Sequence, residues 1–167
     1  MNGSPASDGD FVDRARRDWA LVFPDVDVSP IEVVGRISRL GAQIFARVER
    51  DLAPAGVSRA EFDVLCSLAR SDRPLRASEV TAATMLSGAS TTKQADRLVK
   101  VGLVERLPWE RDGRVVLLQL TDGGRALVER EFPRFLARDQ ELLAGLDEDE
   151  RALAAKLLRK ISARLEP

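Results

Sequence analysis

The side chains best suited to binding chemistry lie in one stretch of the chain, residues 87–121. Its first part is rich in hydroxyl, amide and basic groups, and the candidate contacts are Ser87, Ser90, Thr91, Thr92, Lys93, Gln94 and Arg97. On the first turns of a helix, hydroxyl and ammonium groups can bind phosphates or base edges, and Gln can pair with adenine. An ordinary polar helix face has a similar composition, so the helix by itself leaves both interpretations open.

Two short runs rich in Val and Leu follow this helix, at residues 104–107 and 115–120, and they predict β-strands. The polar segment between them, residues 108–114, contains Pro, Asp, Gly and two Arg residues and predicts a turn. A helix followed by a two-stranded ribbon with a basic tip is typical of a winged helix-turn-helix. In that fold the helix enters the DNA major groove and the tip reaches the neighbouring minor groove.

The predicted wing tip and the first helix of the helix-turn-helix add basic candidates. Arg111 and Arg114 lie in the predicted tip, and Arg76 lies at the start of the first helix, predicted over residues 76–84. Residues 73–114 contain eight basic and five acidic side chains, which give this segment a net charge of +3. Because the whole chain has a net charge of −1, the other residues together carry −4. A basic middle between acidic ends favours a DNA-binding lobe attached to an acidic dimerisation lobe.

Helical patterns surround this lobe, and the predicted fold is mainly α with a small β-wing. The sequence divides into residues 1–9, predicted to be disordered, N-terminal helices for dimerisation and a pocket at 10–57, the DNA-binding lobe at 58–120, and C-terminal dimerisation helices at 121–167. Capping boxes at Ser29–Glu32 and Ser58–Glu61 predict two helix starts, and Thr121 predicts a third. Pro133 should kink the helix that contains it or divide it in two.

Composition excludes several other classes. The chain has no His and no Tyr, which removes His-based acid–base catalysis and a His-rich metal site. No phosphate-binding glycine loop or activated nucleophile is recognisable, so we expect no enzyme, catalytic residue, metal or cofactor. No apolar run approaches the roughly 18 residues of a membrane span, and the polar N-terminus lacks the order of a signal peptide. We therefore expect a cytoplasmic protein that does not bind membranes.

The sequence from residue 85 to residue 121 resembles the corresponding part of a known protein family. Residues 85–98, followed by Val101-Gly102-Leu103-Val104-Glu105-Arg106, are similar to the recognition helix and its exit in the MarR family of transcriptional regulators. Asp112-Gly113-Arg114 and the run ending in Leu120-Thr121 resemble the wing motif of that family, and the similarity spans roughly residues 30–165. The resemblance implies a homodimer that binds a pseudo-palindromic operator as a repressor and is released by a small ligand. It also implies that Asp112 pairs with Arg114 to stiffen the wing, which leaves Arg111 as the groove contact.

A scattered set of residues resembles the urate-responsive branch of the family, which has an extra N-terminal helix. The resemblance implies that Trp19 forms an aromatic wall, that Arg106 binds the ligand anion, and that Asp63 is the carboxylate that the anion repels. The sequence departs from this branch at Gln94, where a second Arg is usual, so urate is one candidate among anionic aromatic ligands. The alternatives are a core position for Trp19 and a structural ion pair between Asp63 and Arg106.

Two competing functions remain at this point. The first is a thiol-sensing regulator of the same fold, in which Cys66, the one cysteine of the chain, is the redox switch. Its position on an apolar helical face with Phe62 and Leu65 favours a core role for this thiol instead. The second is a winged-helix module that binds another protein and not DNA.

Overall fold

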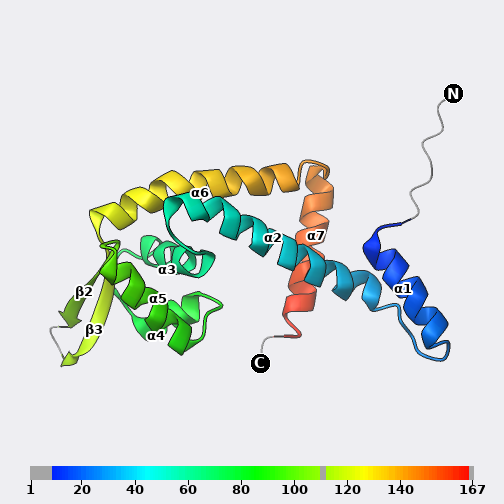
Figure 1. The fold of residues 1–167 in the computed structure, drawn as a ribbon, viewed down its shortest axis with the longest axis horizontal. Coiled ribbons are helices and arrows are strands. Elements are labelled where there is room, and N and C mark those ends of the chain that lie inside the picture. Colours follow the sequence, from blue (N-terminus) through cyan, green and yellow to red (C-terminus); the bar gives the residue numbers. More distant parts are fainter. Residues whose placement is uncertain (1–8, 110–111, 166–167) are drawn as a thin grey trace. The chain divides into compact units, whose positions relative to one another are not determined.

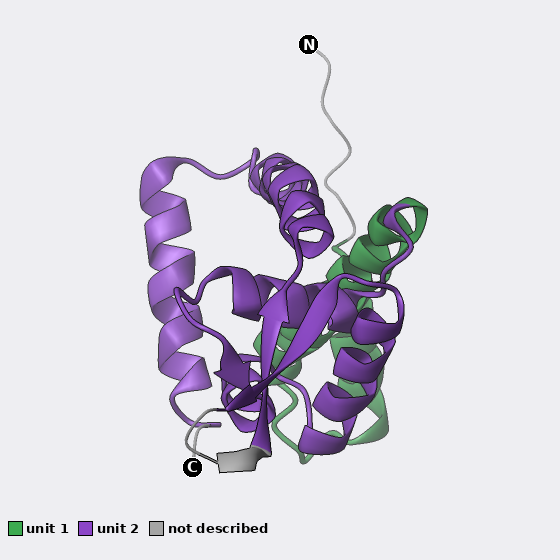
Figure 2. Cartoon of the chain, turned by 90° about the vertical axis from the view of Figure 1, so that its left-hand side faces the viewer, with its two compact units in different colours: residues 1–54 green, residues 55–167 purple. Residues whose placement is uncertain are grey.

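The computed structural model describes residues 9–109 and 112–165, although the side chains of residues 112–114 lie outside the description. The chain forms two compact units, residues 1–54 and residues 55–167, which Figure 2 shows in different colours. Within the described ranges, no helix combines the length and the apolar character that crossing a membrane requires. Each unit has its own helices and its own stabilising contacts.

Unit 1 contains helix α1 (Phe11–Val22), a short π-helix (Ile31–Gly35) and helix α2 (Arg36–Leu52). Asp10 begins α1, since its carboxylate accepts hydrogen bonds from the N–H groups of Val12, at 2.8 Å, and Asp13, at 3.0 Å. The guanidinium of Arg36 binds Asp10 at 2.9 Å and Asp13 at 2.6 Å. These two ion pairs join the start of α1 to the start of α2.

The predicted capping box at Ser29–Glu32 is wrong. The helical segment begins with the π-turn after Pro30, which has no side-chain cap, and the Glu32 carboxylate instead pairs with Arg16 of α1 at 3.0 Å. The sequence spacing fits a capping box, but a partner on another helix competes for the carboxylate. The helix expected to start here is therefore a π-turn continued by α2.

Unit 2 contains the helix-turn-helix and its sheet (Figure 1). After a short 3-10 turn, Ala53–Ala55, its elements are α3 (Arg59–Ala69), β1 (Leu75–Arg76), α4 (Ala77–Ala83), α5 (Gly88–Lys100), β2 (Val104–Trp109), β3 (Asp112–Leu120), α6 (Asp122–Leu142) and α7 (Glu148–Ser162). The antiparallel sheet has the order β1-β3-β2. The predicted fold class, mainly α with a small β-wing, is confirmed.

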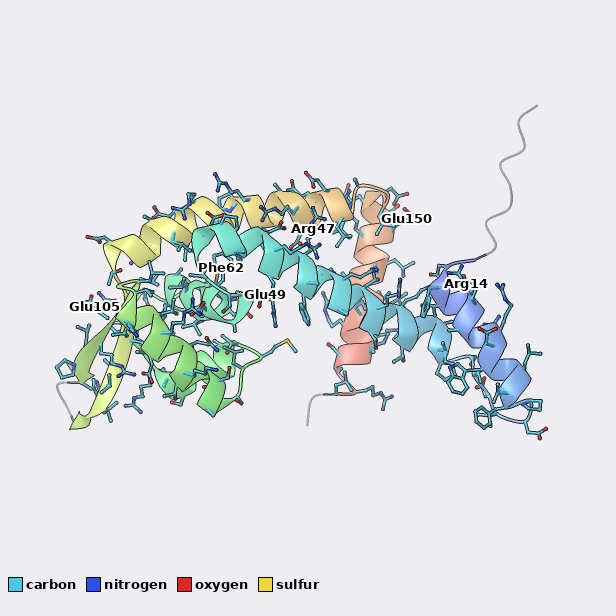
Figure 3. The ribbon with its side chains drawn as sticks, viewed as in Figure 1. Arg14, Arg47, Glu49, Phe62, Glu105 and Glu150 are labelled. Carbon is cyan, nitrogen blue, oxygen red and sulfur yellow. The ribbon has the colours of Figure 1, made fainter. Side chains whose placement is uncertain are left out.

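The core of the winged helix lies between α3, α4, α5 and the sheet. Its fully buried apolar side chains include Val64, Leu65, Val80 and Leu98. Phe62 of α3, labelled in Figure 3, approaches Phe135 of α6 with 6.4 Å between ring centroids. Ala95 and Leu98 on α5 face inward, and both are almost completely shielded from solvent.

The strands of the wing are longer than predicted. β2 and β3 reach Trp109 and Asp112, so most of the segment predicted as a turn belongs to the ribbon. Pro108 has no N–H group, but β2 is an edge strand with one side free of neighbours, where proline is tolerated. The β1 strand was not predicted at all, because two residues are too short for a periodic pattern.

Two of the predicted caps of unit 2 are confirmed. The Ser58 hydroxyl accepts from the Glu61 N–H at 3.2 Å while the Glu61 carboxylate accepts from the Ser58 N–H at 2.7 Å. The Thr121 hydroxyl accepts from the Gly124 N–H at 3.1 Å and begins α6. α6 continues through Pro133, so of the two expected effects of this residue, a kink or a division of the helix, the division is wrong and the kink stays a prediction.

The base of the wing is closed by contacts between residues that enter it and leave it. α5 ends at Lys100, and Gly102, which follows the C-cap residue, has a φ of +76°. The N–H of Gly102 donates to the Val99 carbonyl, and the N–H of Leu103 donates to the Leu98 carbonyl. The Thr121 hydroxyl then donates to the Gly102 carbonyl at 2.7 Å. A β-carbon on Gly124 would lie 2.0 Å from the Leu103 carbonyl oxygen, so this position has no space for a side chain. These contacts fix the wing relative to α5.

Candidate DNA interface

The outward face of α5 carries hydroxyl and basic side chains. Ser87 caps the helix by accepting a hydrogen bond from the Ser90 N–H at 3.2 Å. Thr92, Lys93 and Lys100 are exposed, whereas Ser90 and Gln94 are half-buried. The Thr92 hydroxyl donates to the Gly88 carbonyl at 3.0 Å, which leaves its oxygen able to accept a second bond. The exposed groups can therefore bind an anionic or polar surface.

Thr91 does not belong to this face. Its side chain is fully buried, and its hydroxyl lies 2.9 Å from the hydroxyl of Thr81 on α4. A side chain that faces another helix of the core cannot contact DNA, so the expectation that Thr91 binds DNA is corrected. Its hydrogen bond instead joins the two helices of the helix-turn-helix.

Arg97 joins α5 to α3. Its Nε lies 2.8 Å from Oε1 of Glu61, a carboxylate that is 1% exposed, whereas the Arg97 side chain itself is 58% exposed. The contact is an ion pair and not an aligned hydrogen bond, because Oε1 has no hydrogen-bond donor in the described residues. Since Nε faces Glu61, the two terminal nitrogens of this exposed guanidinium can still be directed to a phosphate.

Arg106 on β2 forms an ion pair with Asp96 on α5. Both side chains are about half-exposed. An aspartate on the exposed face of a DNA-binding helix would repel phosphates, and the paired guanidinium offsets this charge. The pair also joins the wing to α5.

Arg76 and Arg73 have different neighbours, although both lie close to the start of α4. Arg73 binds the Glu79 carboxylate at 2.6 Å, and Glu79 also accepts from the Arg76 N–H at 2.8 Å. These bonds, chiefly the one from Arg73, hold the pKa of Glu79 at about 2. The Arg76 guanidinium lies over the ring of Trp109 on β2, with 4.3 Å between Cζ and the ring centroid.

The tip of the wing lies largely outside the described residues. This applies to Arg111 as a whole and to the side chains of Asp112 and Arg114, so the expected pair between Asp112 and Arg114 stays a prediction. The backbone of Asp112 is described and pairs with Trp109.

The three expected ligand contacts are divided between the units. Trp19 lies on α1 in unit 1, where it is half-exposed and stacks on Phe23 with 5.6 Å between ring centroids. Asp63 and Arg106 lie in unit 2, where Arg59 pairs with Asp63 at 3.1 Å and Asp96 pairs with Arg106. The alternative of a structural pair between Asp63 and Arg106 is therefore wrong. An exposed Trp19 also disagrees with a core position for that residue.

Cys66 is half-buried on α3. Burial, and then the nearby Asp63 carboxylate, raise the pKa of its thiol to about 11. A thiol with this pKa is almost entirely protonated at neutral pH, and the protonated form is a poor nucleophile. These surroundings favour the expected structural role over a redox role.

Sequence reasoning missed three residues of this region. Asp96 could have been noticed as an acidic residue on an otherwise basic helix face, and Trp109 as an aromatic residue beside a basic tip. Glu61 was recognised as part of a capping box, but its second contact, with Arg97, depends on how α3 packs against α5. No spacing in the sequence predicts that contact.

The same architecture occurs in known regulators. A sequence model described as MarR family matches residues 55–115. The HTH-type transcriptional regulator PecS of Dickeya dadantii is 32% identical over 149 residues, which cover 88% of this chain and 90% of PecS. The chain belongs to the MarR family. The multiple antibiotic resistance protein MarR of Escherichia coli is 38% identical over 114 residues, or 66% of this chain and 76% of MarR.

Solved structures of the family agree with the fold. A MarR variant from E. coli, crystallised with operator DNA, has a TM-score of 0.70 at 32% identity and covers 82% of this chain and 98% of its own. A structure of Bordetella bronchiseptica BpsR concerns the regulation of its DNA binding by 6-hydroxynicotinic acid. It has a TM-score of 0.69 at 30% identity, with 78% of this chain and 92% of that chain covered. The resemblance inferred from residues 85–121 is thus confirmed as family membership.

Proposed function

We propose that this MarR-family protein binds a pseudo-palindromic operator as a homodimer and represses transcription until a small anionic aromatic ligand releases it. The observation that carries this proposal is the exposed face of α5, with Thr92, Lys93 and Lys100, on a helix that packs against strand β2 of the wing. In a winged helix-turn-helix this face enters the major groove, and residues at the wing tip enter the minor groove. Because operator DNA lies in the cytoplasm, the proposal includes the expected cytoplasmic location of the protein.

The proposed DNA contacts follow from exposure and chemistry. The contacts on α5 are Ser87, Ser90, Thr92, Lys93, Gln94 and Arg97, together with Arg76 at the start of α4 and Arg111 and Arg114 in the wing. Lys93, Arg76 and Arg97 would bind phosphates and set orientation, whereas Gln94 and the hydroxyl groups can contact base edges. Arg111 would enter the minor groove. Thr91 is left out because it is buried. Structural support for a DNA role also comes from the MarR variant solved with operator DNA.

A homodimer is supported by the apolar face of the last helix. None of the described residues of α7 is buried, and Leu153, Leu157 and Leu158 are each about half-exposed. Apolar surface of this kind is usually covered by another subunit. A two-fold dimer would present two α5 helices to half-sites about one DNA turn, ~10 base pairs, apart.

The ligand part of the proposal concerns Trp19, Asp63 and Arg106. An anion that binds Arg106 must compete with Asp96, because the two side chains form an ion pair. Such competition would expose the Asp96 charge on the DNA-binding face and lower the affinity for DNA. The regulation of BpsR by 6-hydroxynicotinic acid supports a small aromatic acid as the ligand class, with urate as a second candidate.

Fluorescence anisotropy with a labelled duplex from the region upstream of its own gene tests the proposal. A scrambled duplex of the same length is the control, and each titration is repeated over a range of salt concentrations with and without urate or 6-hydroxynicotinate. We expect tight binding to the upstream duplex, a steep decrease of log affinity with log salt, and release by an aromatic acid. Equal binding to both duplexes contradicts operator recognition, and no binding at any salt concentration favours the protein-interaction module.

A further inference from the structure

The contact between Arg76 and Trp109 links two residues that are 33 positions apart and belong to different strands of unit 2. Arg76 is the last residue of β1 and precedes α4, whereas Trp109 is the last residue of β2 before the wing tip. The Arg76 guanidinium carbon lies 4.3 Å from the centroid of the indole ring. At this distance the face of the ring attracts the cation.

The register of the sheet explains why these side chains meet. Arg76 on β1 and Leu107 on β2 pair with the same residue of the central strand, Leu117. Trp109 follows Leu107 by two positions, and an irregularity between Pro108 and Trp109 changes the local register. An irregularity of this kind redirects the side chain that follows it. The indole thus reaches across the sheet to the end of β1.

The charges around Arg76 leave its guanidinium available to a further anion. Arg73, Arg97 and Arg106 each pair with a carboxylate, but no described carboxylate pairs with the guanidinium of Arg76. Both oxygens of the nearest candidate, Glu79, are bound by Arg73 and by the Arg76 backbone N–H. Arg76 itself is exposed. A guanidinium that lies on an aromatic ring keeps its N–H donors at the edge, where they can bind a phosphate.

We propose that Trp109 is a positioning residue that holds the Arg76 guanidinium between α4 and the wing, ready to bind a backbone phosphate of the operator. This inference rests on the proposed DNA binding and adds a specific role for Trp109. The ring restricts the Arg76 side chain before DNA arrives, so less conformational entropy is lost on binding. It also couples the orientation of the wing to that of the helix-turn-helix.

The contact itself can be tested without DNA. The chain has two tryptophans, so protein labelled with 5-fluorotryptophan should give two ¹⁹F resonances, and Trp109→Phe identifies the resonance of Trp109. We expect Arg76→Ala to shift the Trp109 resonance and to leave the Trp19 resonance unchanged as an internal control. An unshifted Trp109 resonance overturns the inference at this step.

The consequence for DNA is tested by the salt dependence of affinity. We expect Arg76→Ala to weaken operator binding about fivefold and to lower the salt slope by about 0.9, which corresponds to one lost phosphate contact. Trp109→Ala should weaken operator binding and lower the salt slope to a similar extent. Arg76→Ala in the Trp109→Ala background should then cause almost no further loss of affinity. Trp109→Phe should retain most of the affinity, because a phenyl ring also attracts the cation. Arg159→Ala, on the polar side of α7, is the matched control for loss of one positive charge.

Additive effects of the two alanine substitutions would show that Trp109 serves only the stability of the wing and would overturn the positioning role. An unchanged salt slope in Arg76→Ala would overturn the phosphate contact. If the wild-type protein binds no DNA, the proposed function is overturned as well. This outcome is distinguishable from failure of the positioning role, because it is observed in the protein without any substitution.

Discussion

The guanidinium of Arg97 lies 2.8 Å from the Glu61 carboxylate, which is almost completely buried at the start of α3. This ion pair connects the proposed recognition helix to the helix that leads into the helix-turn-helix. A buried carboxylate without a counter-charge is costly, so the pair has a structural role in addition to any contact that Arg97 makes with DNA.

The first prediction concerns this pair. Arg97→Ala should lower the free energy of unfolding by about 1–3 kcal/mol, because the Glu61 carboxylate loses its counter-charge. In a Glu61→Gln background the same substitution should cost clearly less, since a neutral amide needs no counter-charge. Urea denaturation of the four proteins measures the difference. An equal loss in both backgrounds would show that the two side chains are not coupled.

The second prediction concerns Asp96 and Arg106. Arg106→Ala should weaken operator binding roughly tenfold, or ~1.4 kcal/mol, because it leaves the Asp96 carboxylate without its cation on the face of α5 that we propose binds DNA. Asp96→Asn in the same protein should restore most of that affinity, since it removes the repelling charge. Anisotropy titrations at one salt concentration compare the two variants. Failure of Asp96→Asn to restore binding would mean that Arg106 contacts DNA directly.

The third prediction concerns the ligand. Trp19→Phe removes the indole N–H and reduces the aromatic surface, so it should raise the ligand concentration needed to release DNA about tenfold, or ~1.4 kcal/mol. The measurement is release of the labelled operator by urate and by 6-hydroxynicotinate. Phe23→Leu is the matched control for loss of the stacking contact on α1. An unchanged response in Trp19→Phe would exclude this residue from the ligand site.

The fourth prediction concerns the wing tip. Arg111→Ala should weaken operator binding about tenfold without changing the thermal midpoint, because a tip residue contributes to the minor-groove contact and not to the core. The loss should be largest for operators with A·T-rich flanks, where the minor groove is narrow. Affinities for A·T-rich and G·C-rich flanks at fixed salt test this. Equal affinities of mutant and wild type would contradict the groove contact.

The fifth prediction concerns Cys66. With a pKa raised to about 11, its thiolate fraction at pH 7 is on the order of 10⁻⁴, and the reaction with thiol reagents should be slow. The rate should rise about tenfold per pH unit until the pH approaches that pKa. Stopped-flow modification from pH 7 to pH 10 measures the profile. Rapid modification at pH 7 with loss of DNA binding, abolished by Cys66→Ser, would support the redox-sensing alternative instead.

The local features of the fold could be predicted because they depend on neighbouring residues. The caps at Ser58 and Thr121 connect groups only three residues apart, and the inward positions of Ala95 and Leu98 follow from helical periodicity. The box at Ser29 has the same spacing and was wrong, since Glu32 has a partner on α1. The same spacing therefore gives a capping box at Ser58, where Glu61 caps the helix and also pairs with Arg97, but not at Ser29, where the Glu32 carboxylate pairs with Arg16.

The sequence by itself determined the family, the order of the main helices and of the two wing strands, and the stretch that carries the proposed DNA contacts. Only the tertiary structure decided which of these groups face solvent and which partners they have. Thr91 and Thr92 are adjacent and chemically alike, yet one is buried against Thr81 and the other is exposed. The pairs of Arg97 with Glu61 and Arg76 with Trp109 each join two elements. The physical reason is that such contacts depend on how elements pack, and the pattern of residues within one element does not contain that information.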